Sequence, residues 1–224
     1  MVKAGKIPRE PFYEDCKEVD RHACIYSDDL YTSKLLKYLE EERETGKPFF
    51  AYVAYTTAHA PLQAPDFLID KYYEHYLELG FEGLKRARFD SQKALGIISQ
   101  DAVFPDSSRN RLLRAWSSLS EEEQRRQARS MATYSAMMES QDYHIGVVLN
   151  YLRETGQLDN TLIVYLADNG PEGLDVRGEL SNPKSTKWIR SNFSQEFDHI
   201  GRGDAFAFIG TDWANASTGG LQWW

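Results

Sequence analysis

A run of apolar and β-branched residues, Thr161-Leu-Ile-Val-Tyr-Leu-Ala-Asp-Asn-Gly170, gives the clearest indication of the fold. Turn residues bound the run, and its length is typical of a strand buried on both faces of a parallel sheet. Ligands of open α/β sheets bind beyond the carboxyl ends of the strands. Asp168 and Asn169 would offer a carboxylate and an amide oxygen to a hard cation there. The alternative is a strand and an ordinary tight turn, because Asn-Gly is a common turn dipeptide.

A second strand is predicted for 47–55, which is aromatic, β-branched and apolar after its first residue. Pro61 and Pro65 follow and prevent the strand from continuing. His59 would therefore lie in a stiff loop just past the carboxyl end of a buried strand, where catalytic residues of α/β proteins are found. The alternative is a histidine with a purely structural role.

Helical patterns precede both strands. An apolar stripe predicts a helix over 27–43 that Ser27 or Asp28 caps and Gly46 ends. Ser120 and Glu123 form the pattern of a capping box, which begins a helix reaching about 152. A third short strand is predicted for 205–210. Helices that alternate with buried strands indicate an α/β fold with a mostly parallel sheet flanked by helices.

Composition narrows the possible functions. The chain has 224 residues, of which 42% are hydrophobic and 27% are charged, as in an ordinary globular protein. The net charge of −8 argues against nucleic acid and anionic membranes as partners. Cys16 and Cys24 are too few for a disulfide framework, although one bridge between them stays open. There is no hydrophobic segment typical of a signal peptide, so we expect a cytoplasmic location for the chain as written.

Several stretches, taken together and in order, resemble the sulfatase family, and most closely its bacterial and fungal alkyl/aryl-sulfatase branch. The resemblance covers nearly the whole chain from about Tyr26, because the stretches follow one another at compatible spacing. They are Pro48-Phe-Phe-Ala-Tyr-Val-Ala-Tyr55 with Ala58-His-Ala-Pro-Leu-Gln-Ala-Pro65, Tyr134-Ser-Ala-Met-Met-Glu139 with Asp142 and Ile145-Gly146, Thr155 to Gly170, and Ile200-Gly-Arg202 with Trp213-Ala-Asn-Ala-Ser217.

The resemblance implies a fold similar to that of alkaline phosphatases and a small-molecule sulfate ester as the substrate. It also implies one divalent cation, usually Ca²⁺, at the carboxyl ends of strands. Carried over by position, Asp168 and Asn169 look like two of the metal ligands. His59 looks like the histidine that contacts the sulfate ester near its leaving oxygen, where negative charge builds during cleavage.

The chain also departs from the family pattern. The family's nucleophile is a formylglycine made from Cys or Ser in a Cys/Ser-x-Pro-x-Arg motif, which is absent here. Asp28-Asp29 stands at a helix start and is not assigned to the metal site. We therefore expect an irregular segment over 1–25 and, over 26–224, a partial sulfatase domain truncated at both ends and inactive by itself. The alternatives are a phosphate or phosphonate ester hydrolase of the same superfamily, and a non-catalytic remnant.

Overall fold

The computed structural model describes residues 12–19, 26–107, 110–174 and 182–221. The chain divides into two compact units. The first unit contains Ala58–Met137 and Tyr165–Trp224, and the second contains Lys3–Thr57 and Met138–Val164. The long helix α3 (Glu121–Glu154) contributes its amino-terminal half to the first unit and its carboxy-terminal half to the second.

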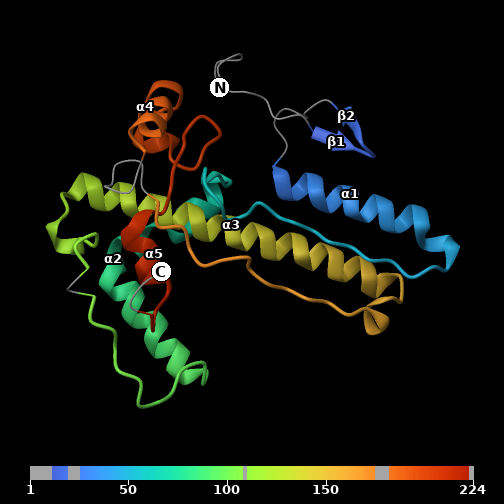
Figure 1. Ribbon diagram of the computed structural model, residues 1–224, viewed down its shortest axis with the longest axis horizontal. Helices are drawn as coiled ribbons and strands as arrows, with labels where there is room; N and C mark the ends of the chain where they lie inside the picture. The colour runs from blue at the N-terminus through green and yellow to red at the C-terminus, as the bar shows by residue number, and fades with distance from the viewer. Residues whose placement is uncertain (1–11, 20–25, 108–109, 175–181, 222–224) are drawn as a thin grey trace. The chain divides into compact units, whose positions relative to one another are not determined.

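The first unit is built from helices packed around one buried tryptophan. Beside the first half of α3 it holds α2 (Asp66–Ala94), η2 (Trp116–Ser118), α4 (Pro183–Asn192), η4 (Phe197–His199) and α5 (Gly210–Ser217) (Figure 1). Trp213 of α5 is fully buried, and its indole nitrogen donates a hydrogen bond of 2.9 Å to the carbonyl oxygen of Gln127 on α3. Edge-to-face contacts with Tyr76 and Phe81 of α2 surround its ring. These contacts hold α2, α3 and α5 together.

Gly80 divides α2 at a point where no other residue fits. Its φ of 62° lies in the left-handed region, and a Cβ atom built there would lie 2.6 Å from the ring of Trp116. The missing side chain therefore lets the η2 tryptophan lie directly against the bend in α2.

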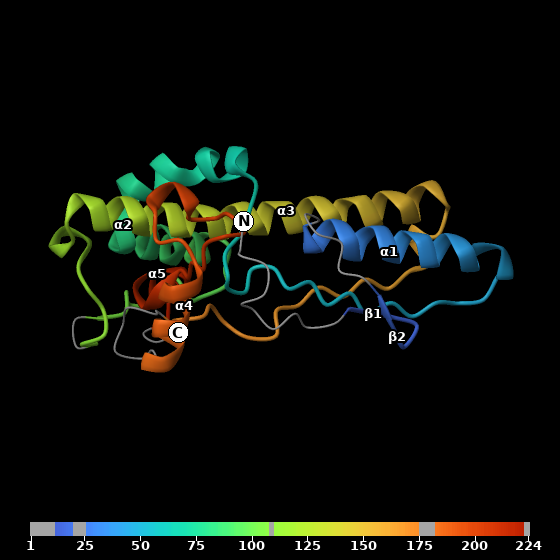
Figure 2. The same cartoon turned by 90° about the horizontal axis from the view of Figure 1, so that it is seen from above.

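The second unit pairs α1 (Ser27–Glu42) with the carboxy-terminal half of α3. His144 Nε2 lies 3.3 Å from an oxygen of Asp29, and the Tyr151 hydroxyl donates a hydrogen bond of 2.8 Å to Glu40. Because the first contact joins the starts of these segments and the second joins their ends, the two helices run in the same direction (Figure 2). The turns η1 (Arg43–Thr45) and η3 (Leu158–Asn160) follow the two helices.

A short antiparallel hairpin lies within the segment predicted to be irregular over 1–25. Its strands are β1 (Phe12–Glu14) and β2 (Lys17–Val19). Asp15 and Cys16 form its turn with positive φ angles of 50° and 61°. The carboxylate of Glu14 accepts a hydrogen bond of 2.7 Å from Lys34 on α1. Cys16 is a free thiol, whereas Cys24 lies outside the described residues.

The structure confirms most of the helix prediction. The capping box forms, because the Ser120 hydroxyl accepts from the Glu123 amide and the Glu123 carboxylate accepts from the Ser120 amide. Gly46 adopts the left-handed conformation expected after the first helix. The prediction that Ser27 or Asp28 caps α1 was wrong, since Tyr26 occupies the N-cap position and makes no capping bond from its side chain.

The structure does not confirm the predicted parallel sheet. Segments 47–55 and 161–167 are extended but belong to no ladder, and 205–209 makes a single isolated bridge before α5 begins. Among the described residues, β1 and β2 form the only sheet. A strand gains its backbone hydrogen bonds only from neighbouring strands. The part of the chain that the structure describes places no such neighbour beside these segments.

Candidate active-site elements

The loop that follows residue 57 presents His59 to solvent. The Nδ1 atom of His59 lies 2.6 Å from the carbonyl oxygen of Ala60. Because a carbonyl oxygen can only accept, Nδ1 must donate the proton of this hydrogen bond. Nε2 is then left for an external group: it accepts a hydrogen bond when the ring is neutral and donates one when the ring is charged.

Backbone hydrogen bonds fix this loop on the first unit. The amide of Leu62 donates to the carbonyl of Ala207, and the amide of Ala64 donates to that of Gly201, both at 3.0 Å. Leu62 is only 1% exposed, and the amide of Gln63 donates to the sulfur of Met137 at 3.3 Å. The His59 loop therefore rests on the segment 200–207, which is far from it in the sequence.

Gly201 allows this close approach. Its φ of 95° is a conformation that side-chain-bearing residues rarely adopt, and an added Cβ atom would overlap Ile69 and lie 2.9 Å from the Thr133 hydroxyl. Next to it, Arg202 donates to the carboxylate of Asp66 at 3.0 Å, at the start of α2. The segment thus lies against α2 and α3 at the glycine and is tied to α2 by the residue that follows it.

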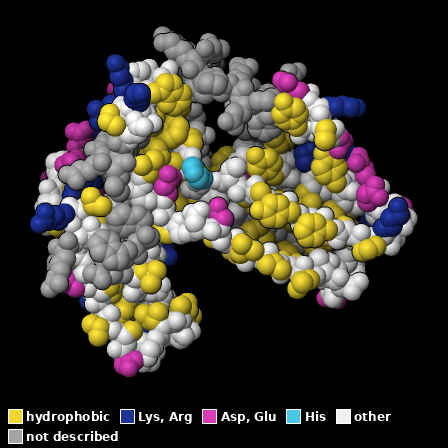
Figure 3. All heavy atoms as spheres, viewed as in Figure 1, with side chains coloured by type: hydrophobic (Ala, Val, Ile, Leu, Met, Phe, Trp, Pro, Cys, Tyr) yellow, Lys and Arg dark blue, Asp and Glu magenta, His cyan; other side chains and the backbone are white. Residues whose placement is uncertain are grey.

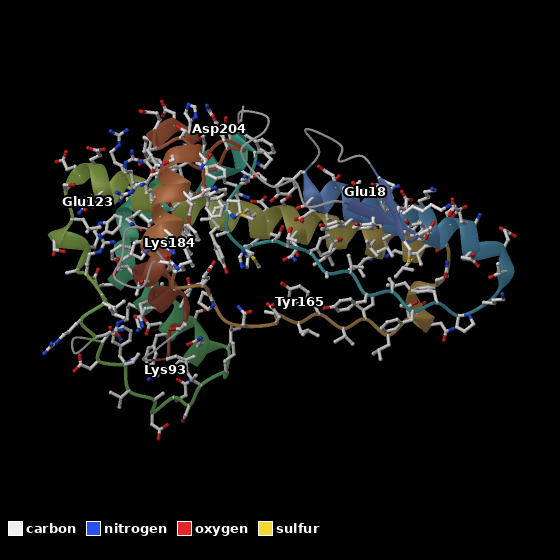
Figure 4. All side chains as sticks on the ribbon, turned by 45° about the horizontal axis from the view of Figure 1, so that its top comes forward. Glu18, Lys93, Glu123, Tyr165, Lys184 and Asp204 are labelled. Carbon is white, nitrogen blue, oxygen red and sulfur yellow. The ribbon has the colours of Figure 1, made fainter. Side chains whose placement is uncertain are left out.

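Asp168 and Asn169 lie at the end of the extended segment 161–167, in a bend, and both are exposed. Tyr165, labelled in Figure 4, lies on the same segment. The side-chain nitrogen of Asn169 donates to the carbonyl of Gly170 at 2.8 Å, which leaves its side-chain oxygen available to accept. Further on, Thr211 of α5 donates to the carbonyl of Gly173 at 2.7 Å.

The described residues do not gather the predicted site residues into one centre. No hydrogen bond or ion pair within them joins His59 to Asp168 or Asn169, and they contain no group of three His, Cys, Asp or Glu side chains able to hold a metal. Ca²⁺ takes about six to eight oxygen ligands, whereas Asp168 and Asn169 supply two side chains. The donor type suits calcium, but these two side chains are an incomplete donor set.

A histidine–aspartate pair was missed in the sequence. Nδ1 of His199, just before the segment 200–207 that supports the His59 loop, lies 2.8 Å from Oδ2 of Asp204 within that segment. Partial burial is the largest single influence and acts to raise the pKa of Asp204, but the hydrogen bond from His199, the Coulombic attraction of His199 and smaller favourable contacts together outweigh it, so the pKa lies below its usual value. A spacing of five residues in a loop carries no periodic signal, so only the fold reveals the pair.

Buried Asp28 was also not anticipated. Its carboxylate is inaccessible to solvent and accepts a hydrogen bond of 2.6 Å from the Thr57 hydroxyl, while Ser27 donates to it at 3.3 Å. The residue fastens the end of segment 47–57 to the start of α1.

None of the helices in the described ranges has the length and apolar character needed to cross a membrane.

Comparison with known proteins gives a consistent result. The family model described as Sulfatase matches residues 7–201. An uncharacterized sulfatase of Schizosaccharomyces pombe is 36% identical over 196 residues, which are 87% of this chain and 34% of that protein. An arylsulfatase of Klebsiella aerogenes is 34% identical over 193 residues, or 86% of this chain and 40% of that protein. Arylsulfatase J of Mus musculus is 28% identical over 73% of this chain. The chain spans less than half the length of these curated relatives.

Proposed function

The chain belongs to the sulfatase family, and from this we propose that it contributes to the hydrolysis of sulfate monoesters. The observation that carries the proposal is the ordered match over most of the chain to an arylsulfatase and a sulfatase, together with the loop that presents His59. The proposed substrate is a small-molecule sulfate ester.

His59 is proposed to act on the leaving oxygen of the ester. Cleavage of a sulfate monoester places negative charge on that oxygen. With Nδ1 donating to Ala60, Nε2 is the atom that can meet the oxygen, and it donates a proton or a hydrogen bond when the ring is charged. The rigid support of the loop by Ala207 and Gly201 would hold Nε2 in place without further ordering.

Asp168 and Asn169 are proposed to be two ligands of a divalent cation. Their oxygen atoms are of the type that Ca²⁺ prefers, and both side chains are exposed at the end of an extended segment. When bound, such a cation would supply positive charge next to the nonbridging oxygens of the sulfate. The remaining ligands would come from residues other than those described here.

The nucleophile is proposed to come from outside this chain. Cys16 precedes Lys17-Glu18-Val19, so it lacks the Pro and Arg of the formylglycine motif. We therefore expect the chain by itself to hydrolyse no aryl sulfate.

A chimaera tests the proposed function. This chain replaces the stretch that it matches in the Klebsiella aerogenes arylsulfatase, and the rates on 4-nitrophenyl sulfate and 4-nitrophenyl phosphate are compared. We expect the sulfate ester to be the better substrate, and H59A to lower kcat by about 100-fold or more. H75A is the matched control, because His75 is an exposed histidine on α2, and it should leave kcat unchanged.

Three other results of the chimaera experiment would contradict parts of the proposed function. Faster turnover of the phosphate ester would support the phosphate or phosphonate hydrolase reading. A folded chimaera inactive on both esters would support a non-catalytic remnant. Equal rates for wild type and H59A would show that His59 has no part in the reaction.

A further inference from the structure

Arg129 of α3 is a buried cation that the proposed reaction does not use. It is only 8% exposed, and its Nε atom donates a hydrogen bond of 3.1 Å to the carbonyl oxygen of Ile200. Its Nη1 and Nη2 atoms each lie 3.6 Å from a carboxylate oxygen, of Asp70 and of Asp66 respectively. The Cζ atom of the guanidinium group lies 5.4 Å from the centroid of the Phe197 ring. Burying a charge is costly unless it is paired, so these contacts fix the side chain in one place.

Arg129 contacts both of the segments that meet at the end of the His59 loop. On one side it binds the 200–201 turn, whose second carbonyl oxygen accepts the amide of Ala64 at 3.0 Å. On the other side it faces Asp66, which begins α2 two residues after Ala64. These contacts form a closed ring that runs from Arg129 through the turn and the loop and back to Arg129. The loop cannot leave the turn without breaking the ring, so Arg129 restrains the loop.

Two arginines share the carboxylate of Asp66, and Arg129 is the buried one. The Nη2 atom of Arg202 lies 3.0 Å from the same carboxylate, but the Arg202 side chain is 47% exposed. An exposed ion pair contributes little to stability, whereas removing one partner from a buried contact has a large effect. Arg129 should therefore control the position of the turn more strongly than Arg202 does.

The three partners of Arg129 require a guanidinium group. The Nε, Nη1 and Nη2 atoms lie in one plane and point in different directions, so one side chain can meet a carbonyl oxygen and two carboxylates. A lysine side chain carries a single nitrogen atom and cannot meet all three at once. The substitution R129K therefore keeps the charge and removes the geometry.

Exposed charges do not replace this contact. Lys and Arg side chains and Asp and Glu side chains are interspersed over the part of the first unit that is seen in Figure 3. Interactions between exposed charges are screened beyond about 8 Å at physiological ionic strength. The effect of Arg129 on the loop therefore arises from its contacts and not from a long-range field.

We propose that Arg129 is a positioning residue for His59. By holding the 200–201 turn against the start of α2, it keeps the loop in the conformation in which Nε2 of His59 meets the leaving oxygen of the ester. A displacement of about 1 Å can slow an enzymatic reaction by about 100-fold, so such a restraint matters for the rate. This role rests on the proposed function of His59, whereas the restraint of the loop can be measured without turnover.

Amide exchange followed by NMR in the isolated chain tests the restraint. We expect R129K to speed the exchange of the Ala64 amide by about 10-fold or more, while the amides of 131–137 on α3 keep their protection. R126K is the matched control, because Arg126 also lies on α3 and donates to a backbone carbonyl, that of Gln195, which is outside the 200–201 turn. Unchanged exchange of Ala64 in R129K would overturn the proposal. Loss of protection throughout 131–137 would also overturn it, because Arg129 would then serve the general stability of the unit.

The choice of leaving group tests the consequence for the reaction in the chimaera with the Klebsiella aerogenes arylsulfatase. Phenyl sulfate has a poorer leaving oxygen than 4-nitrophenyl sulfate and therefore depends more on a proton donor. We expect R129K to lower kcat by about 30-fold on phenyl sulfate and by about 3-fold on 4-nitrophenyl sulfate, with KM changed by about 2-fold or less. R126K should leave both rates unchanged.

The two failures can be told apart. An equal loss of kcat on both esters in R129K is the result of a merely structural role and would overturn the proposal. Faster exchange of the Ala64 amide in R129K, together with an unchanged kcat in H59A, would count against the proposed function and not against the restraint of the loop by Arg129.

Discussion

Arg114 and Asp212 form a two-point ion pair across the first unit. The guanidinium nitrogens Nε and Nη2 donate to one carboxylate oxygen at 2.9 and 2.7 Å, and the backbone amide of Arg114 donates to the other at 2.8 Å. Asp212 is only 5% exposed, so its charge depends on these partners. The pair fastens the segment before η2 to the first turn of α5, beside the tryptophan at the centre of the core.

We expect R114A to destabilise the first unit by about 2 kcal/mol, because it leaves a buried carboxylate with fewer donors. This expected loss of stability is smaller than the usual cost of breaking a fully buried ion pair, because the Arg114 side chain is 42% exposed. Urea unfolding followed by tryptophan fluorescence measures the loss. R43A, which removes the exposed ion pair with Glu40, is the control and should cost about 0.5 kcal/mol or less. Equal losses would contradict the prediction.

Substitution at Gly201 should disturb the His59 loop. G201A forces a Cβ atom into Ile69 and Thr133 at a positive φ, and we expect a loss of about 2–3 kcal/mol together with faster exchange of the Leu62 and Ala64 amides. G203A is a matched control two residues away, where a Cβ atom would meet nothing within 4 Å. If the two variants unfold at the same urea concentration, the close approach at Gly201 does not support the loop.

Tyr26 should make stability fall at high pH. Burial, with the charge of Asp28 as the next cause, raises the pKa of Tyr26 from 10.0 to about 12. The folded state therefore keeps this proton after the unfolded state has lost it. Its contribution to stability is complete below pH 10 and is lost as the pH rises toward 12. The free energy of unfolding of wild type minus that of Y26F, measured at several pH values between 9 and 12, should decrease. If this difference in the free energy of unfolding does not change between pH 9 and 12, the hydroxyl of Tyr26 is not buried in the folded state.

Lys85 should make stability rise with pH, whereas Tyr26 makes it fall. The side chain is buried and its ammonium group donates to Asn215 Oδ1 at 2.6 Å and to the Ser107 hydroxyl at 2.8 Å. Burial lowers the pKa of Lys85 below 10.5, so the unfolded state binds this proton more readily than the folded state does. Stability should therefore rise with pH in the window just below 10.5. K85M has no ionisable group at this position, and the difference between wild type and K85M isolates the effect. A difference that decreases with pH in that window would contradict it.

Calcium should not stabilise the chain alone. Asp168 and Asn169 are the two proposed ligands, and a site with so few protein oxygens binds weakly. We expect the melting temperature to be the same in millimolar CaCl₂ and in EDTA. In the chimaera, EDTA should lower the melting temperature, and D168A should remove that effect. A calcium-dependent melt of the chain alone would mean that the described residues already form a complete site.

Local sequence patterns were sufficient for the helices. The Ser120–Glu123 capping box and the left-handed Gly46 depend on contacts within a few residues, so their sequence signals were reliable. The apolar runs 47–55 and 161–167 were predicted to be buried strands, but the structure assigns no strand to either and leaves most of their residues exposed. Strand pairing depends on neighbours that are distant in the chain, and the structure records no ladder for either run.

For the candidate site, the sequence by itself determined the residue types: an imidazole before a proline, and a carboxylate and an amide before a glycine. Only the tertiary structure decided their surroundings. The support of the His59 loop by Ala207 and Gly201 and the pairing of His199 with Asp204 arise from packing between distant segments. Hydrogen bonds of this kind follow no sequence period, because their partners are brought together by the burial of Trp213 and the residues around it.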